Sequence, residues 1–325
     1  MAIKDVTLGV DIGGTNTKFG FVDRNGKSIT EMSIPTNAHE PPENLIARLH
    51  AKVDEMYRPL ASTHSLKGIG FGAPNANYYR GTVENPPNLS WKGVVDVKAL
   101  VRKYYDLPVA VTNDANAAAL GEMLYGAARG MKNFVVITLG TGLGSGIVAG
   151  GELVYGADGF AGEIGHTMVD PEGRECGCGA RGHLETYASA TGICRTVGEL
   201  LAIRRAESEL RSIPPRDLTS RMIADAANRG DAVAIEAFEY TGRILGMKLA
   251  DSVAHLSPEA IILFGGLAAS GPLIFEPTKR SLEEYLLPIF RNKVRLIPSG
   301  LKEGDTAVLG ASALIWNEIL TTRNR

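Results

Sequence analysis

The sequence predicts an α/β fold built from two lobes. Three observations carry this prediction: a length of 325 residues, an alternation of strand-like and helix-like segments, and a glycine-rich turn that occurs twice. A chain of this length exceeds what a single hydrophobic core usually supports, so two domains are expected. Each lobe would carry one of the two glycine-rich turns.

The two glycine-rich turns, over residues 10–18 and 138–146, share one pattern of strand, tight turn and strand. Glycine allows a positive φ and lets backbone N–H groups approach an anion closely. Each turn adds a threonine hydroxyl, and Asp11 could hold Mg²⁺ through water. Neither turn fits a P-loop or a dinucleotide-binding turn, because both of those patterns require a following helix. Each alone is also typical of an ordinary hairpin, but the pair favours two phosphate-binding turns.

The other elements of the first lobe follow from apolar spacing and from turn-forming residues. In order, the sequence predicts a helix over 42–57, a buried strand over 69–72, a long functional loop over 73–93, a helix over 95–105, a strand over 109–111 and a helix over 115–124. The predicted first lobe is residues 1–116 together with the C-terminal helix at about 306–325.

The second lobe, residues 117–305, combines the second glycine-rich turn with a loop-like stretch and then a helical region. In order, the sequence predicts a loop over 150–186, helices over 188–209, 219–228 and 231–256, a strand over 261–264 that ends in the turn Gly265-Gly266, and a last helix over 307–320 that returns to the first lobe.

Composition excludes several classes of protein. The chain is 44% apolar and 22% charged with a net charge of −2, which gives no reason to expect nucleic-acid or membrane binding. No run reaches the ~18 apolar residues of a membrane span, and the charged N-terminus does not resemble a signal peptide. Three cysteines fit a reducing compartment better than a disulfide framework. We therefore expect a cytoplasmic protein.

Asp114 is the candidate catalytic carboxylate. It follows a predicted strand and opens a predicted helix, and the carboxyl ends of strands line the ligand crevice in open α/β sheets. A carboxylate there can accept the proton of a substrate hydroxyl that attacks a phosphoryl group. The alternative is an aspartate that only caps its own helix.

A cluster of histidine and cysteine in the 150–186 loop predicts a metal site. His166, Cys176, Cys178 and His183 offer two nitrogens and two sulfurs, the ligand set of a closed tetrahedral zinc site. Four protein ligands leave no open position, so the zinc would be structural. Two buried thiols beside two surface histidines are the alternative.

Five motifs together resemble the ROK family of sugar kinases and repressors, and within it the bacterial glucokinases. They are residues 11–18, 113–118, 139–146 and 162–166, and the Cys-x-Cys-Gly-x-x-Gly-x-x-Glu box over 176–185. The resemblance runs in order from about residue 7 to residue 316. It implies a two-lobed, actin-like (ribonuclease H-like) ATPase fold with a central cleft and a zinc-binding loop, and a homodimer or homotetramer.

The resemblance also implies roles for individual residues. Asp114 would be the general base on the sugar 6-hydroxyl, and His166 would offer one ring nitrogen to zinc and the other to the sugar. The sugar would be bound by Asn88, Asn113, Asp114, Glu163, His166 and Glu185. The phosphates of ATP and Mg²⁺ would be bound by Asp11, Gly13, Gly14, Thr15, Asn16, Lys18, Thr141, Gly142, Gly265 and Gly266. The family usually has cysteine at the position of His183, and histidine is also a zinc ligand.

The predicted activity is ATP-dependent phosphorylation of a hexose, with glucose first and fructose, mannose, allose or N-acetylmannosamine as alternatives. Nucleotides other than ATP, or polyphosphate, would fit the same turns as donor. A sugar-sensing repressor is the alternative from another class, but only about six residues precede the first predicted strand, too few for a helix-turn-helix. An actin-like structural ATPase would need neither the metal box nor the Glu163/Glu185 pair.

Overall fold

The computed structural model describes residues 3–301 and 306–323, and it divides the chain into two compact units. The N-terminal unit comprises Met1–Gly130, Leu153–Ala161 and Gly300–Arg325, and the central unit comprises Met131–Glu152 and Gly162–Ser299. The structure therefore places the boundary after Gly130, where the sequence predicted it after Asn116. The reason is that helix α3 (Asp114–Leu124) packs on helix α8 (Thr306–Arg323), which keeps both in the N-terminal unit.

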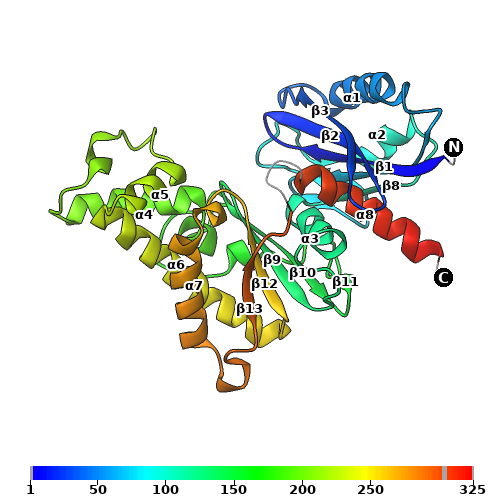
Figure 1. The fold of residues 1–325 in the computed structure, drawn as a ribbon. Helices are drawn as coiled ribbons and strands as arrows, with labels where there is room; N and C mark the ends of the chain where they lie inside the picture. The colour runs from blue at the N-terminus through cyan, green and yellow to red at the C-terminus, as the bar shows by residue number, and fades with distance from the viewer. Residues whose placement is uncertain (1–2, 302–305, 324–325) are drawn as a thin grey trace. The chain divides into compact units, whose positions relative to one another are not determined.

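The N-terminal unit is built on a five-stranded sheet in the order β3-β2-β1-β4-β8 (Figure 1). Strands β1 and β2, and β2 and β3, pair antiparallel, whereas β1/β4 and β4/β8 pair parallel. The strands are β1 (Lys4–Ile12), β2 (Asn16–Asp23), β3 (Ser28–Pro35), β4 (His64–Gly72) and β8 (Val109–Thr112), and the helices besides α3 and α8 are α1 (Pro42–Tyr57) and α2 (Val97–Arg102).

Two glycines let α8 cross this sheet at close range. A Cβ on Gly9 of β1 would lie 2.1 Å from the carbonyl oxygen of Val308, and one on Gly70 of β4 would lie 1.8 Å from that of Ala311. Any side chain at either position would push the helix off the sheet. The last helix thus returns to the first lobe, as predicted from the sequence.

The predicted loop over residues 73–93 is mostly irregular, but it contains two short strands that belong to a small sheet. Strands β5 (Ala76–Asn77), β6 (Thr82–Glu84) and β7 (Val94–Val95) form a three-stranded antiparallel sheet. The strands are only two or three residues long, too short for a periodic pattern to reveal.

The central unit repeats the strand arrangement of the N-terminal unit. Its sheet has the order β11-β10-β9-β12-β13, with β9/β10 antiparallel and β9/β12 and β12/β13 parallel. The glycine-rich turns join β1 to β2 and β9 to β10, the equivalent strands of the two sheets. The strands are β9 (Phe134–Leu139), β10 (Leu143–Ala149), β11 (Glu152–Leu153), β12 (Ala260–Phe264) and β13 (Arg295–Pro298).

Four helices complete the central unit: α4 (Ala190–Ile203), α5 (Ser220–Asn228), α6 (Ala232–Leu256) and α7 (Pro272–Tyr285). Helices α6 and α7 pack side by side, where a Cβ on Gly246 would meet the carbonyl oxygen of Thr278 at 2.3 Å. Helix α4 ends at Ile203, earlier than predicted, and α7 and β13 are elements that the sequence reading missed. None of the described helices is long and apolar enough to span a membrane.

Candidate functional site

A hydrogen bond within its own backbone closes the turn between β1 and β2. Thr36, the residue that follows β3, donates two further hydrogen bonds to this turn. The Gly13 N–H donates to the Asn16 carbonyl at 3.1 Å. Thr36 donates its backbone N–H to the Thr15 carbonyl at 2.9 Å and its hydroxyl to the Gly13 carbonyl at 2.7 Å. The sequence reading missed Thr36, because nothing in the local pattern distinguishes it from an ordinary residue after a strand.

Close approach, and not backbone conformation, explains one glycine in each turn, Gly14 and Gly142. The expectation of a positive φ is wrong for Gly13, Gly14, Gly140 and Gly142, none of which is in that region. Instead, a Cβ on Gly14 would lie 3.0 Å from the Asn88 carbonyl oxygen, and a Cβ on Gly142 would lie 2.6 Å from Oε2 of Glu185. Each turn therefore lies directly against a predicted sugar-binding residue of its own unit.

Asp11 lies in the sheet of the N-terminal unit with a cation on one side and a glycine on the other. It pairs with Lys18 of β2 and with Gly72 of β4. A Cβ on Gly72 would be 3.6 Å from Oδ1 of Asp11 and 3.9 Å from the Cα of Asp114, so these two aspartates converge over Gly72.

This arrangement raises the pKa of Asp11 to about 7. Burial is the largest cause, the Asp114 carboxylate adds to it, and Lys18 opposes it. A carboxyl group whose pKa is raised this far is typical of a functional site. A cation bound beside it would stabilise the ionised form and lower its pKa.

The structure assigns the capping role at α3 to Asn113 instead of Asp114. Oδ1 of Asn113 accepts from the Asn116 N–H at 2.7 Å, as an N-cap does. Asp114 is the first residue of the helix, and its Oδ1 accepts from the neighbouring Ala115 N–H at 2.9 Å. The residue keeps exposed surface, while the protein atoms around its carboxylate raise its pKa above the ordinary value. The exposed surface leaves the carboxylate open to a ligand.

The β9–β10 turn is tied to the start of helix α4. The Gly140 N–H donates to the Gly142 carbonyl at 3.1 Å. The Ala190 N–H donates to the Gly140 carbonyl at 2.9 Å, and the Thr191 hydroxyl donates to the Thr141 carbonyl at 2.7 Å. The positive end of the α4 dipole thus lies beside this turn, which favours a nearby anion.

The third glycine turn lies beside the end of β9. Gly265 has φ +100°, and a Cβ on it would be 2.7 Å from the Leu139 carbonyl oxygen, so no other residue fits there without strain. The Leu267 N–H donates to the same carbonyl at 3.2 Å. Gly266, next along the chain, faces open space.

The four predicted metal ligands gather at one point of the central unit. The ligand atoms of His166, Cys176, Cys178 and His183 all lie within 4.8 Å of one another. Nδ1 of His166 is 3.2 Å from Nδ1 of His183 and 3.7 Å from Sγ of Cys176, and Nδ1 of His183 is 3.3 Å from Sγ of Cys178. Tetrahedral zinc bonds of about 2.0–2.3 Å imply ligand separations of roughly 3.3–3.8 Å, so the donor set fits zinc.

Glu185 links the metal cluster to the second glycine-rich turn. Its Oε1 accepts from Sγ of Cys176 at 2.9 Å, while its Oε2 faces Gly142. Burial and this carboxylate raise the pKa of the Cys176 thiol to about 12, and a metal ion would reverse that shift. His166 has its second nitrogen, Nε2, 3.9 Å from the Glu163 carboxylate, so its two ring nitrogens face different groups.

Arg174 holds the segment that contains Cys176, Cys178 and His183 against helix α4. The sequence alone did not predict this role. Its guanidinium donates to the carbonyls of Thr186 and Gly192 at 2.7 and 3.2 Å and lies 4.6 Å from the Tyr187 ring centroid. Only 7% of its side chain is exposed, and it pairs with Glu199. An arginine inside a polar loop carries no local signal that it will be buried.

The predicted residues divide between the two units, and within each unit they cluster. The N-terminal unit carries Asp11, Gly13, Gly14, Thr15, Asn16, Lys18, Asn88, Asn113 and Asp114, and the central unit carries Thr141, Gly142, Glu163, His166, Cys176, Cys178, His183, Glu185, Gly265 and Gly266. The first set combines carboxylates with a glycine turn, and the second combines glycine turns with a metal-ligand cluster.

Comparison with known proteins identifies the family. The ROK family model matches residues 7–318. A glucokinase of Halalkalibacterium halodurans is 38% identical over 95% of this chain and 94% of its own length. The crystal structure of a ROK family glucokinase from Streptomyces griseus, in complex with glucose and AMPPNP, is 33% identical with a TM-score of 0.78 over 95% of this chain and 98% of that one. A xylose repressor of Bacillus spizizenii is 27% identical over 97% of this chain but 78% of its own length. The chain therefore belongs to the ROK family, and it has that family's two-sheet, actin-like fold.

Proposed function

We infer that this chain catalyses the ATP-dependent phosphorylation of glucose at the 6-hydroxyl, giving glucose 6-phosphate. The observation that carries this inference is the pair of carboxylates, Asp11 and Asp114, beside a glycine turn. They occur in a chain that matches glucokinases over nearly its whole length. Phosphoryl transfer requires positioning and charge stabilisation more than covalent chemistry, and these groups supply both.

Asp114 is the general base in this proposal. Its carboxylate would accept the proton of the sugar 6-hydroxyl as that oxygen attacks the γ-phosphorus of ATP and the bond to the β-phosphate oxygen breaks. Two observations support the role: Asn113 caps the helix in its place, and the Asp114 side chain keeps exposed surface. The protein atoms around the carboxylate partly exclude water from it and raise its pKa, which makes the ionised carboxylate a stronger base.

The sugar hydroxyls would be bound by polar side chains. The proposed set is Asn88, Asn113, Glu163, His166 and Glu185. Metal ligation through Nδ1 would fix the tautomer of His166 and leave its Nε2–H to donate to a sugar oxygen. Buried hydrogen-bonding groups discriminate against analogues that leave them unpaired.

The phosphates and Mg²⁺ would lie at the glycine turns. Asp11 would hold Mg²⁺, which when bound neutralises charge that develops on the transferred phosphoryl group. Thr15 and Thr141 offer hydroxyls, Lys18 offers a charge, and the remaining proposed contacts are the backbone groups of Gly13, Gly14, Asn16, Gly142, Gly265 and Gly266. The closeness of α4's N-terminus to Gly140 supports an anion beside the second turn.

Structural zinc at His166, Cys176, Cys178 and His183 would hold the loop that carries Glu185. Metal analysis of protein purified without chelator should find about one zinc per chain. Cys178→Ser should lower that content several-fold, whereas Cys194→Ser should not, because Sγ of Cys194 donates to the Leu218 carbonyl and lies outside the cluster. Wild-type protein that contains no metal and unfolds at the same temperature with and without added zinc would refute the site.

A panel of hexoses and donors tests the activity. With ATP, we expect the highest kcat/KM for glucose over fructose, mannose, allose and N-acetylmannosamine, and higher turnover with ATP than with polyphosphate. No turnover with any sugar would remove the kinase proposal. Sugar binding without turnover would favour the repressor-like function that the similarity to xylose repressors raises. A homodimer or homotetramer stays a prediction, which light scattering would test.

A further inference from the structure

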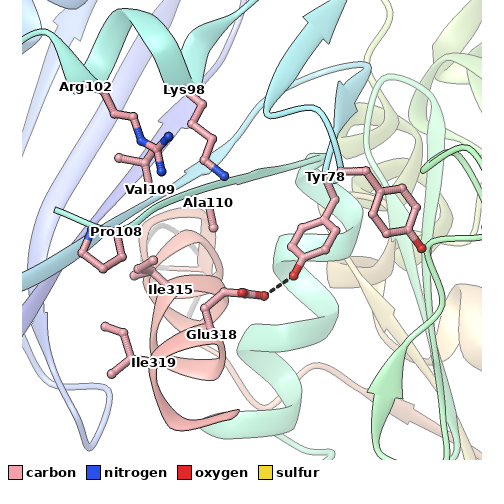
Figure 2. Close-up of a pocket in the computed structure, with 10 residues that line it drawn as sticks. Tyr78, Lys98, Arg102, Pro108, Val109, Ala110, Ile315, Glu318 and Ile319 are labelled. Carbon is pink, nitrogen blue, oxygen red and sulfur yellow. Dashed lines mark hydrogen bonds between the residues drawn. The ribbon is translucent and has the colours of Figure 1, made fainter. Parts of the chain in front are cut away.

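A cavity of about 510 Å³ lies in the N-terminal unit, and it contains none of the proposed catalytic or sugar-binding residues. Its floor is the start of β8 (Pro108, Val109 and Ala110), and helices α2 and α8 form two of its walls (Figure 2). The candidate base Asp114 follows the opposite end of β8. A cavity of this volume is within the range of small-molecule sites.

Two cations extend into this cavity from one face of α2. Figure 2 shows Lys98 and Arg102 one turn apart, both directed toward the space over β8. Neither forms an ion pair with a carboxylate in the part of the chain that the structure describes. Like charges at positions i and i+4 destabilise a helix. A bound anion would relieve this cost.

The structure holds Lys98 in place. A Cβ on Gly81, which has φ +71°, would lie 2.7 Å from the Cβ of Lys98, so the lysine stem packs directly on that glycine. The Lys98 N–H also donates to the Gly81 carbonyl at 3.0 Å. The lysine is therefore directed by packing and is not a freely moving surface side chain.

Apart from Glu318, the rest of the lining is apolar and aromatic. Ile315 and Ile319 lie one turn apart on α8 and face the cavity opposite the cations. Tyr78 is fixed on both sides: its hydroxyl donates to Glu318, and its ring stacks on Tyr155 with centroids 3.9 Å apart at 6°. The Tyr79 hydroxyl donates to the Gly156 carbonyl at 2.9 Å. The walls are thus preformed.

We propose that this cavity binds an organic phosphate monoester with an apolar or aromatic body. The dianionic phosphate would lie between Lys98 and Arg102, and the arginine fork suits phosphate oxygens. The apolar body would contact Ile315, Ile319 and the tyrosine rings. Glu318 also lines the cavity, but it lies on α8 and accepts the hydrogen bond of Tyr78, whereas the phosphate would lie on the α2 side beside the two cations. The proposal concerns a second site and does not depend on the proposed kinase activity.

Calorimetric titration with phenyl phosphate tests the site, with inorganic phosphate as the probe that lacks the apolar body. We expect the wild-type chain to bind phenyl phosphate at least tenfold more tightly than inorganic phosphate. The double variant Lys98→Gln/Arg102→Gln should weaken phenyl phosphate binding at least tenfold, as expected for loss of charged hydrogen bonds. Lys103→Gln is the matched control, because this lysine follows α2 directly and does not line the cavity.

A second variant tests the apolar contacts of the cavity independently of the charges of Lys98 and Arg102. Ile319→Ser should weaken binding of phenyl phosphate several-fold and leave binding of inorganic phosphate unchanged. Thermal unfolding without ligand should show that each variant is folded. The proposal fails if phenyl phosphate does not bind at millimolar concentration, or if the double variant binds it as tightly as Lys103→Gln does, which would place the binding elsewhere, for instance at the glycine turns.

Discussion

Replacing Asp114 by asparagine should change catalysis strongly and stability little. The substitution keeps the shape of the side chain. It also keeps an oxygen that can accept from the Ala115 N–H, which in the wild-type chain lies 2.9 Å from Oδ1 of Asp114. It removes the negative charge and with it the ability to accept a proton. A general base contributes about 10²–10⁴-fold to rate, which is about 2.7–5.4 kcal/mol of activation free energy.

The expected effect on stability is much smaller. Loss of a charge beside a helix N-terminus costs about 0.3–1 kcal/mol, and Asn113 retains the cap itself. Relief of the repulsion with Asp11 acts in the opposite direction. The unfolding free energy should therefore change by no more than about 1 kcal/mol, a shift in Tm of at most about 4 °C for a domain of this size.

The assay measures kcat and KM for glucose with ATP, sugar binding by calorimetry, and Tm. Asp96→Asn is the matched control, because Asp96 also stands at a helix start in the same unit, where its Oδ1 accepts from the Ala99 N–H at 2.8 Å. Asparagine caps as well as aspartate, so this variant should keep full activity. An Asp114→Asn enzyme with normal glucose binding and a kcat within tenfold of wild type would refute the assignment of the base.

Three further predictions concern other features. Because the folded pKa of Asp11 is about 7 and its ordinary value is 3.8, the folded state binds more protons and loses stability as the pH rises between these values. Asp11→Asn should therefore raise Tm relative to wild type by an amount that grows from pH 4 to pH 8, while it abolishes phosphorylation. Gly70→Ala should lower the unfolding free energy by about 1–3 kcal/mol or more, since the new methyl would meet the Ala311 carbonyl at 1.8 Å. Gly198→Ala, at an open position of α4, should instead stabilise by about 0.5–1 kcal/mol.

A specific result would contradict each of these predictions. A Tm difference for Asp11→Asn that stays constant with pH would show that Asp11 ionises normally. For Gly70→Ala and Gly198→Ala, thermal or urea unfolding of both variants beside wild type measures the two opposite changes in stability. If Gly70→Ala is as stable as wild type, α8 does not lie as close to β4 as the structure places it.

The sequence contained enough to predict the fold class and the main candidate residues. Strand–turn–strand patterns around Asp11 and Thr141 are local, and the sheets repeat them at equivalent strands. The cluster of His166, Cys176, Cys178 and His183 was also predictable, because these residue types at short spacing leave few alternative structures. In both cases the signal lies within a few consecutive residues.

Other features depended on distant parts of the chain. Helix α8 belongs with β1 and β4 because of close backbone contacts at Gly9 and Gly70, separated from it by more than 200 residues. The position of the unit boundary, the burial of Arg174 and the support of the first turn by Thr36 arise in the same way. No local pattern reports such contacts.

Taken alone, the sequence determined which side chains offer chemistry: the carboxylates at 11 and 114, the glycine turns, and the histidine and cysteine ligands. Only the tertiary structure decided what each one does locally. It gave the helix cap to Asn113 instead of Asp114, and it explained Gly14 and Gly142 by close approach instead of by positive φ. The physical reason is that residue type is a local property, whereas proximity, burial and electrostatic coupling arise only when distant segments pack together.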